Sequence, residues 1–144
     1  MSENENAAAA ASRETIIVVE DSPPNRKILA HLLEKLGFHV IACEHGQQAW
    51  DQIKDGKIQN LAAVVSDIMM PTMDGLNLLK LIRENPDSAK LPVLLITAMS
   101  DKEYIVRARE LNVDGYILKP VTFERVSSKL REIFPHKEFP RIAG

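Results

Sequence analysis

Several features that would point to particular classes of protein are scarce or missing in this chain of 144 residues. The single cysteine, Cys43, excludes an intramolecular disulfide, and the apolar run around it predicts a small core residue rather than a reactive thiol. The four histidines show no metal-ligand spacing, and the formal net charge of -2 offers no basic field for a nucleic acid. We therefore expect a protein of the reducing cytoplasm whose partners are other proteins.

Long apolar runs are also missing. No run approaches the roughly 18 residues of a membrane-spanning helix, and the alanines at 7–11 follow acidic and amide residues rather than the basic start of a signal peptide. The protein is therefore expected to be neither embedded in a membrane nor exported. What is present is a globular composition, 45% hydrophobic and 26% charged, and a length that suits one domain.

The middle of the chain alternates short β-branched runs with amphipathic helical stretches. The predicted strands are 15–19, 38–43, 62–66, 93–96 and 115–118. The predicted helices are 23–36, 47–54, 75–83, 102–111 and 123–134. Ser22 and Thr122 are candidate N-caps, and Gly37 and Pro135 end the first and last helices. This alternation predicts an α/β fold with a parallel sheet covered by helices on both faces, while residues 1–13 and 135–144 are expected to lie outside the core.

Polar residues follow the apolar strands at the ends where open α/β sheets bind ligands. They are Glu20 and Asp21 after the first strand, Asp67 after the third, Thr97 after the fourth and Lys119 after the fifth. Each alone is ordinary where a strand meets solvent. Together they are less ordinary, because the three carboxylates among them form a cluster that stays ionised only beside compensating positive charge.

A hard divalent cation and Lys119 are able to supply that charge. Mg²⁺ prefers oxygen ligands and keeps several waters, so Asp21 and Asp67 are expected to be direct ligands and Glu20 to act through water. A carboxylate is also able to accept a phosphoryl group, whose transfer depends on positioning and on neutralising its oxygens. Lys119 and the Thr97 hydroxyl are candidates for that task.

Four sequence blocks carry a resemblance to a known family. They are VVED at 18–21, DIMMPTMDG at 67–75, ITA at 96–98 and KP at 119–120. Over about residues 14–134, the chain resembles the receiver domains of response regulators in two-component signalling. The resemblance implies a flavodoxin-like, doubly wound sheet of five parallel strands in the order 2-1-3-4-5 with five helices.

The resemblance also implies roles for individual residues. Asp67 is the expected phosphoacceptor, and the carbonyl group of Met69 is expected to complete a Mg²⁺ shell with Glu20, Asp21 and Asp67. Thr97, Ala98 and Lys119 are expected to bind the phosphoryl group, with Tyr116 as the aromatic residue that moves with the switch. A cis peptide bond is expected between Lys119 and Pro120. Met69 and Met99 occupy the positions that flank the approach of water, which predicts slow hydrolysis.

The expected function is a phosphorylation switch rather than an enzyme with a separate substrate. The resemblance implies a histidine kinase or a histidine phosphotransfer protein as phosphodonor and a protein target on the face made by 102–111, 115–118 and 123–134. No DNA-binding effector is expected after the last helix. The segments at 74–80, 91–94 and 121–134 resemble chemotaxis regulators, whereas EDSPPNR at 20–26 resembles receivers attached to hybrid histidine kinases, which makes a phosphorelay shuttle the alternative.

Two other classes compete with this interpretation. Haloacid-dehalogenase-like phosphatases also phosphorylate an aspartate after a parallel strand, but they need a second aspartate two residues later as general acid. That position is Met69 here, which has no proton to donate. A receiver-like fold without the chemistry would be expected to lack an acid, the acceptor or the lysine, and this chain has all of them.

Overall fold

The computed structural model describes residues 13–70, 73–98, 102–137 and 139. Over this part of the chain, five strands form one parallel sheet in the order β2-β1-β3-β4-β5, which confirms the predicted fold and strand order. The strands are β1 (Thr15–Val19), β2 (His39–Cys43), β3 (Leu61–Asp67), β4 (Val93–Thr97) and β5 (Gly115–Leu118).

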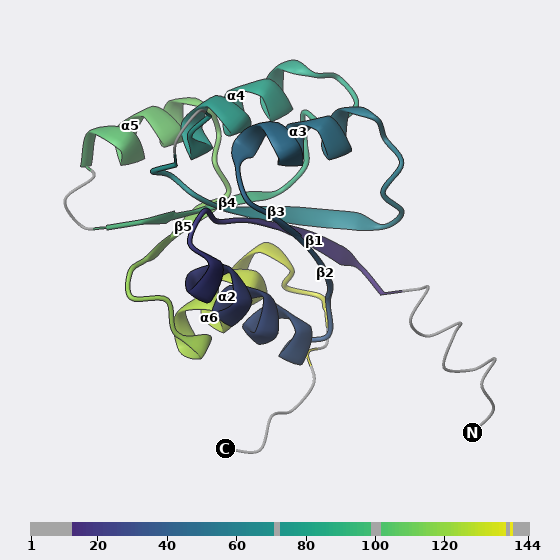
Figure 1. Cartoon of the computed structure of the whole chain (residues 1–144), viewed down its shortest axis with the longest axis vertical. Coiled ribbons are helices and arrows are strands. Elements are labelled where there is room, and N and C mark those ends of the chain that lie inside the picture. Colours follow the sequence, from purple (N-terminus) through teal and green to yellow (C-terminus); the bar gives the residue numbers. More distant parts are fainter. Residues whose placement is uncertain (1–12, 71–72, 99–101, 138, 140–144) are drawn as a thin grey trace.

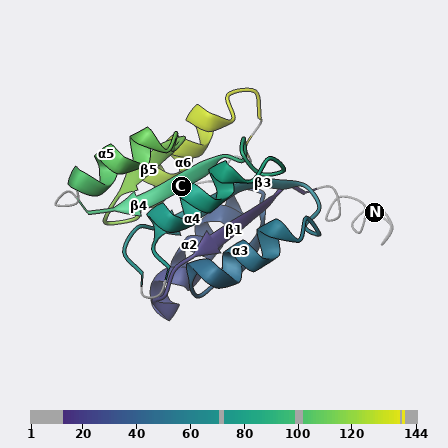
Figure 2. The ribbon, with the colours of Figure 1, turned by 90° about the horizontal axis from the view of Figure 1, so that it is seen from above.

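Helices cover both faces of this sheet. They are α2 (Pro23–Lys35), α3 (Gly46–Lys54), α4 (Gly75–Glu84), α5 (Lys102–Glu110) and α6 (Phe123–Ile133). Helices α3, α4 and α5 lie on one face, and α2 and α6 lie on the other (Figure 1). The view from above shows α3, α4 and α5 side by side over the sheet (Figure 2). Among the described residues, no helix is long and apolar enough to cross a membrane.

Alternate side chains of the strands supply two hydrophobic cores, as the period of two in a β-strand requires. On one face, Ile17, Val19 and Val64 pack against α3, α4 and α5. On the other face, Ile16 and Val18 pack against α2 and α6. The central strands are therefore almost wholly apolar, and polar side chains gather at the two ends of the sheet.

The end of α2 differs from the sequence-based prediction. The pattern places Phe38 in the second strand, but its N–H donates to the carbonyl oxygen of Leu33 (3.2 Å), and the Gly37 N–H donates to Glu34 (3.0 Å). Gly37 has a φ of 99°, which glycine adopts without steric cost. Phe38 therefore belongs to the C-terminal cap of α2, and the strand begins at His39. A buried apolar residue after glycine fits either structure by pattern alone.

The segment after α6 also contacts the core. The Phe139 ring lies 6.2 Å from that of Phe38, and the Lys137 ammonium is 2.6 Å from a Glu14 carboxylate oxygen. The expectation that residues 135–144 lie wholly outside the core is therefore wrong at Phe139. The domain limits of 14–134 stay a prediction.

The amino-terminal end of the sheet contains a network around Arg83, at the end of α4. Its guanidinium group donates to the carbonyl oxygens of Ala89 (3.1 Å), Leu91 (2.6 Å) and Asn112 (2.9 Å) and to the Asp114 carboxylate (2.8 Å). Asp114 in turn accepts the N–H of Val93, the first residue of β4, at 2.7 Å. This network joins α4, the loop before β4 and the loop before β5.

Candidate functional site

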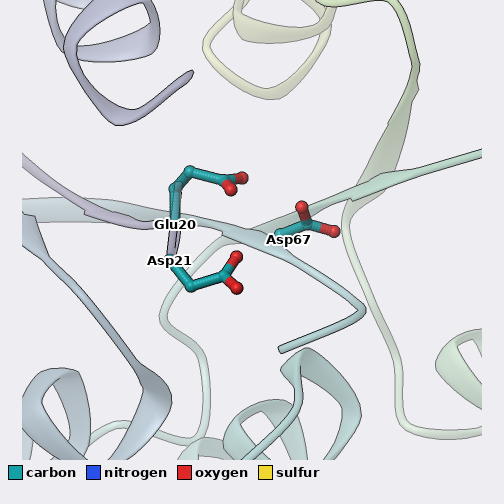
Figure 3. Close-up of side chains that lie close together, drawn as sticks. All are labelled: Glu20, Asp21 and Asp67. Atoms are coloured by element: carbon teal, nitrogen blue, oxygen red, sulfur yellow. The ribbon is translucent and has the colours of Figure 1, made fainter. Parts of the chain in front are cut away.

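Three carboxylates meet at the opposite, carboxyl-terminal end of the sheet. Glu20 and Asp21 directly follow β1, and Asp67 is the last residue of β3, where it pairs in register with Ile96. Because β1 and β3 are neighbouring parallel strands, their last residues reach the same edge. One oxygen of each carboxylate lies within 4.8 Å of the others, and the three side chains extend to the same side (Figure 3). The structure therefore brings these predicted residues together.

Asp67 is buried in this cluster and bonded at both oxygens. Its Oδ2 lies 2.9 Å from Nζ of Lys119, and its Oδ1 accepts the N–H of Met69 at 3.2 Å. The Asp67 side chain is 5% exposed, whereas that of Lys119 is 42% exposed. The lysine thus reaches in from the surface to a buried carboxylate, and its charge compensates part of the negative charge there.

Glu20 shows that this compensation is incomplete. Burial, followed by the nearby Asp67 carboxyl group, raises the pKa of Glu20 from 4.5 to about 7. A hydrogen bond from the Ser22 N–H to Oε1 of Glu20 (3.1 Å) acts in the opposite direction. Near neutral pH a further cation would therefore stabilise this buried cluster more than it would stabilise an exposed set of acids.

The donors in this cluster are carboxylate oxygens, which suit hard cations such as Mg²⁺. Within the described part of the chain, the cluster includes no cysteine or histidine, the ligands that favour zinc or copper. The oxygen ligands of this cluster are therefore of the kind that the predicted metal, Mg²⁺, prefers. Met69 is 52% exposed, and the role predicted for its carbonyl group stays a prediction.

The N-terminus of α4 lies directly behind the acceptor. Gly75 donates its N–H to the carbonyl oxygen of Ile68 (2.9 Å), and a Cβ atom at Gly75 would lie only 2.6 Å from the carbonyl oxygen of Asp67. Asp74 caps the helix by accepting the N–H of Asn77 at 2.8 Å. The Asp74-Gly75 pair thus has a physical reason, because only glycine allows the helix to approach the acceptor strand so closely.

Thr97 is the last residue of β4 and is buried. Its hydroxyl group donates to the carbonyl oxygen of Ala98 (3.1 Å), and its own carbonyl oxygen accepts the N–H of Lys119 (2.9 Å). Thr97 and Lys119 are therefore adjacent in space, as the sequence predicted. Met99, the second residue expected to flank the acceptor, lies outside the described residues.

Tyr116 lies on β5, an edge strand, and is half-buried. The Lys129 ammonium stands 5.8 Å from the centre of its ring, a cation–π distance. Tyr116 also lines a groove of about 740 Å³ between α5, β5 and α6. The predicted switch residue therefore lies beside a hollow surface.

Two arginines near the site were not predicted. Arg26 Nη1, on α2, donates to the Glu20 carbonyl oxygen at 2.9 Å. Arg125 Nη1, on α6, donates to the carbonyl oxygens of Leu118 (3.0 Å) and Pro120 (3.1 Å). The peptide bond between Lys119 and Pro120 is cis. Both arginines bind main-chain carbonyl groups, for which a sequence has no signature.

The chain is similar to known proteins in sequence and in fold. Residues 16–131 match the family model described as the response regulator receiver domain. The chain is 39% identical over 120 residues to the chemotaxis protein CheY-3 of Vibrio cholerae, an alignment that covers 83% of this chain and 90% of that protein. It is 32% identical over 119 residues to a chemotaxis protein CheY homolog of Campylobacter jejuni, with 82% and 90% covered.

Solved structures agree with this assignment. A signal receiver domain of a signal transduction histidine kinase from Syntrophus aciditrophicus superposes with a TM-score of 0.75 at 29% identity, covering 91% of this chain and 99% of that one. A protein from Chloroflexus aurantiacus, whose structure was solved as that of a "putative response regulator", gives a TM-score of 0.78 at 25% identity, with 87% of this chain and 100% of that one covered. With five strands in the predicted order and the acid cluster at their carboxyl ends, this chain belongs to the response regulator receiver family.

Proposed function

We propose that this receiver is a phosphorylation switch that accepts a phosphoryl group on Asp67 from a phosphohistidine of a histidine kinase or histidine phosphotransfer protein. The observation that supports this most is the surroundings of Asp67, which is buried, paired with Lys119 and within reach of Glu20 and Asp21. An isolated carboxylate is a weak nucleophile that repels a phosphate, whereas here Lys119, together with a cation held by the three carboxylates, would offset that repulsion.

The transfer forms one bond and breaks one. A carboxylate oxygen of Asp67 attacks phosphorus, the bond from phosphorus to the donor imidazole nitrogen breaks, and the imidazole keeps the electron pair and takes a proton from solvent. The product is an acyl phosphate on Asp67. The chain thus acts on itself, catalysing its own phosphorylation and dephosphorylation, and has no separate substrate to turn over.

The residues around Asp67 have distinct tasks in this proposal. Glu20, Asp21, Asp67 and the carbonyl group of Met69 would hold Mg²⁺, which would supply positive charge to phosphoryl oxygens. Lys119, now paired with Asp67, contacts the transferred group. The Thr97 hydroxyl leaves the Ala98 carbonyl group to donate to the phosphoryl group, and the main chain at Ala98 moves with it. This relocation changes the surface around Tyr116.

The output surface is the face of α5, β5 and α6. Its groove is lined by charged side chains of α5 and α6, among them Arg109, Glu124 and Lys129, and by the half-buried Tyr116 of β5. A protein target that reads this face responds to the movement of Tyr116. The similarity to two CheY proteins supports a target in chemotaxis and a cytoplasmic location.

A phosphorelay shuttle is the second candidate. It would pass the phosphoryl group from Asp67 to a histidine phosphotransfer protein instead of binding a target. The 29% identity to the receiver domain of a histidine kinase favours it. A phosphatase with an aspartate nucleophile is disfavoured because Met69 offers no proton at the position of the general acid.

The decisive experiment is to incubate the protein with Mg²⁺ and acetyl phosphate, a small acyl phosphate, and to map the modified residue by peptide mass spectrometry. The proposal expects one phosphoryl group on Asp67, and none when EDTA removes the metal. Modification at another residue, or none with Mg²⁺ present, would contradict it. Adding a histidine phosphotransfer protein to the phosphorylated receiver separates the candidates, because only the shuttle returns its phosphoryl group rapidly.

A further inference from the structure

Arg125 joins helix α6 to the loop that carries Lys119. Its Nη1 donates to two main-chain carbonyl oxygens, that of Leu118 at 3.0 Å and that of Pro120 at 3.1 Å. These two groups belong to the residues on either side of Lys119. An Nη1 group has two hydrogens, so both bonds form at once, and bonds from a charged donor are stronger than neutral ones.

Helix α6, which carries Arg125, is held in place by its N-cap and by packing in the core. The Thr122 hydroxyl caps it by accepting the Arg125 N–H at 3.2 Å. One and five residues after Arg125, Val126 and Leu130 are fully buried in the core shared with α2. The guanidinium group therefore extends from a part of the helix whose backbone is fixed by a cap and by core packing.

The loop itself lies at the edge of the sheet. Strand β5 ends at Leu118 and has a strand neighbour on one side only. The Lys119 N–H donates to Thr97 (2.9 Å), which holds the loop to β4. Beyond this point the stem of Lys119 must cross to Asp67, where Nζ is 2.9 Å from Oδ2. The direction of that stem depends on the orientation of the main chain at 118–120.

We propose that Arg125 is a positioning residue for the phosphoacceptor site: by holding the carbonyl groups of Leu118 and Pro120, it keeps the Lys119 ammonium in place at Asp67. This inference rests on the proposed function, because it takes Lys119 as the group that contacts the phosphoryl oxygens. Arg125 itself does not touch the reacting atoms. Its effect on phosphorylation passes through Lys119, which separates it from a residue that only stabilises the fold.

The test measures the rate of Asp67 phosphorylation by acetyl phosphate at saturating Mg²⁺ in Arg125→Gln and Arg125→Lys. Small misplacements of a catalytic group cost up to about a hundredfold in rate, and we expect Arg125→Gln to be slower than wild type by about tenfold. Arg125→Lys restores most of the rate, because an ammonium group still donates to the carbonyl oxygens. Arg107→Gln, which removes the same charge from an exposed position on α5, is the matched control and keeps the wild-type rate.

A second background shows whether the effect passes through Lys119. In Lys119→Gln, adding Arg125→Gln lowers the remaining rate by less than about twofold, since coupled residues are not additive. Equal effects in both backgrounds, or a rate for Arg125→Gln equal to that of Arg107→Gln, would overturn the inference. Thermal unfolding of each variant checks that it is folded, and Arg125→Met, which also lacks the donors, carries the test if Arg125→Gln does not fold. Absence of phosphorylation on Asp67 in the wild type would instead contradict the proposed function.

Discussion

The two ends of the sheet both hold charged side chains, but they hold them differently. At the amino-terminal end, the Arg83 guanidinium is satisfied by three carbonyl groups and by Asp114, and its side chain is only 13% exposed. At the carboxyl-terminal end, three carboxylates share the charge of Lys119, and the pKa of Glu20 is raised to about 7. The first arrangement has its charges paired within the chain, whereas the second has negative charge left over.

This difference separates structure from function in physical terms. A network whose donors and acceptors are all paired gains nothing by binding a further ion, so it acts as a brace between loops. A cluster with excess negative charge lowers the stability of the protein by itself, and a bound cation offsets this loss. Substitutions at the carboxyl-terminal end should therefore affect phosphorylation, whereas substitutions at the amino-terminal end should affect stability.

The largest expected effect is the complete loss of phosphorylation in Asp67→Asn. The amide keeps the shape of the side chain but removes the nucleophile. The lost ion pair with Lys119 is offset by weaker repulsion from Glu20, so the free energy of unfolding changes by less than about 1 kcal/mol. Peptide mass spectrometry and urea unfolding measure the two quantities.

Asp114→Asn at the other end is the matched control for this variant. It removes a carboxylate that accepts from both Arg83 and the Val93 N–H, so it loses stability and keeps phosphorylation of Asp67. If Asp114→Asn lost phosphorylation while remaining folded, the division between the two ends would be wrong.

The next effect in size is on stability, in Arg83→Met. Methionine keeps much of the aliphatic stem but none of the donors, which leaves carbonyl groups and Asp114 without their partner. We expect the free energy of unfolding to fall by about 2 to 3 kcal/mol, the range for bonds with charged groups. Urea unfolding measures this difference, and the folded variant is phosphorylated at the wild-type rate.

Lys80→Met, one turn earlier on α4, provides the comparison for Arg83→Met. Lys80 is exposed, and its ion pair with Glu84 is 4.0 Å long, so its loss changes stability by about 0.5 kcal/mol or less. Equal destabilisation by both variants would mean that helix composition, rather than the network, explains the effect.

The two ends also differ in how well they could be predicted. Asp67, Thr97 and Lys119 were found because apolar strands precede them and the carboxyl ends of parallel strands share an edge. The Arg83 and Arg125 contacts were not, because their partners are main-chain carbonyl groups in loops whose course depends on the folded structure. Phe38 shows the same limit, since an apolar residue after glycine fits a strand as well as a helix cap. Local pattern therefore predicted the order of elements and the acid cluster, but not what braces the loops.

A smaller effect on stability comes from Glu20→Gln. In EDTA, the folded wild type binds a proton at Glu20 more tightly than the unfolded chain does, because the pKa rises from 4.5 to about 7 on folding. Stability is therefore lost as the pH rises through this range. The Glu20→Gln variant lacks this loss, and above pH 7 we expect it to be more stable than wild type by about 1 kcal/mol.

Thermal unfolding at a series of pH values measures this difference, and added Mg²⁺ is expected to reduce or reverse it. The added ion stabilises the wild type more than Glu20→Gln, because the variant offers one fewer negative charge. Glu124→Gln, an exposed acid at the start of α6, is the control and shows no such dependence on Mg²⁺. Parallel profiles of stability against pH for wild type and Glu20→Gln in EDTA would contradict a raised pKa of Glu20 in the folded protein.

The smallest expected effect concerns the lifetime of the phosphorylated form. Met69 follows the acceptor by two residues and is 52% exposed beside Asp67. A thioether is a weak hydrogen-bond acceptor and orients water poorly, whereas an amide both donates and accepts. Met69→Asn should therefore speed hydrolysis of the Asp67 acyl phosphate by a few-fold, which corresponds to less than about 1.4 kcal/mol of barrier. The measurement follows phosphoryl loss at saturating Mg²⁺ after the phosphodonor is removed. Met69→Leu, which is apolar and similar in size, is the control and keeps the wild-type lifetime. Equal lifetimes in Met69→Asn and wild type would show that this side chain does not govern the approach of water to the acyl phosphate.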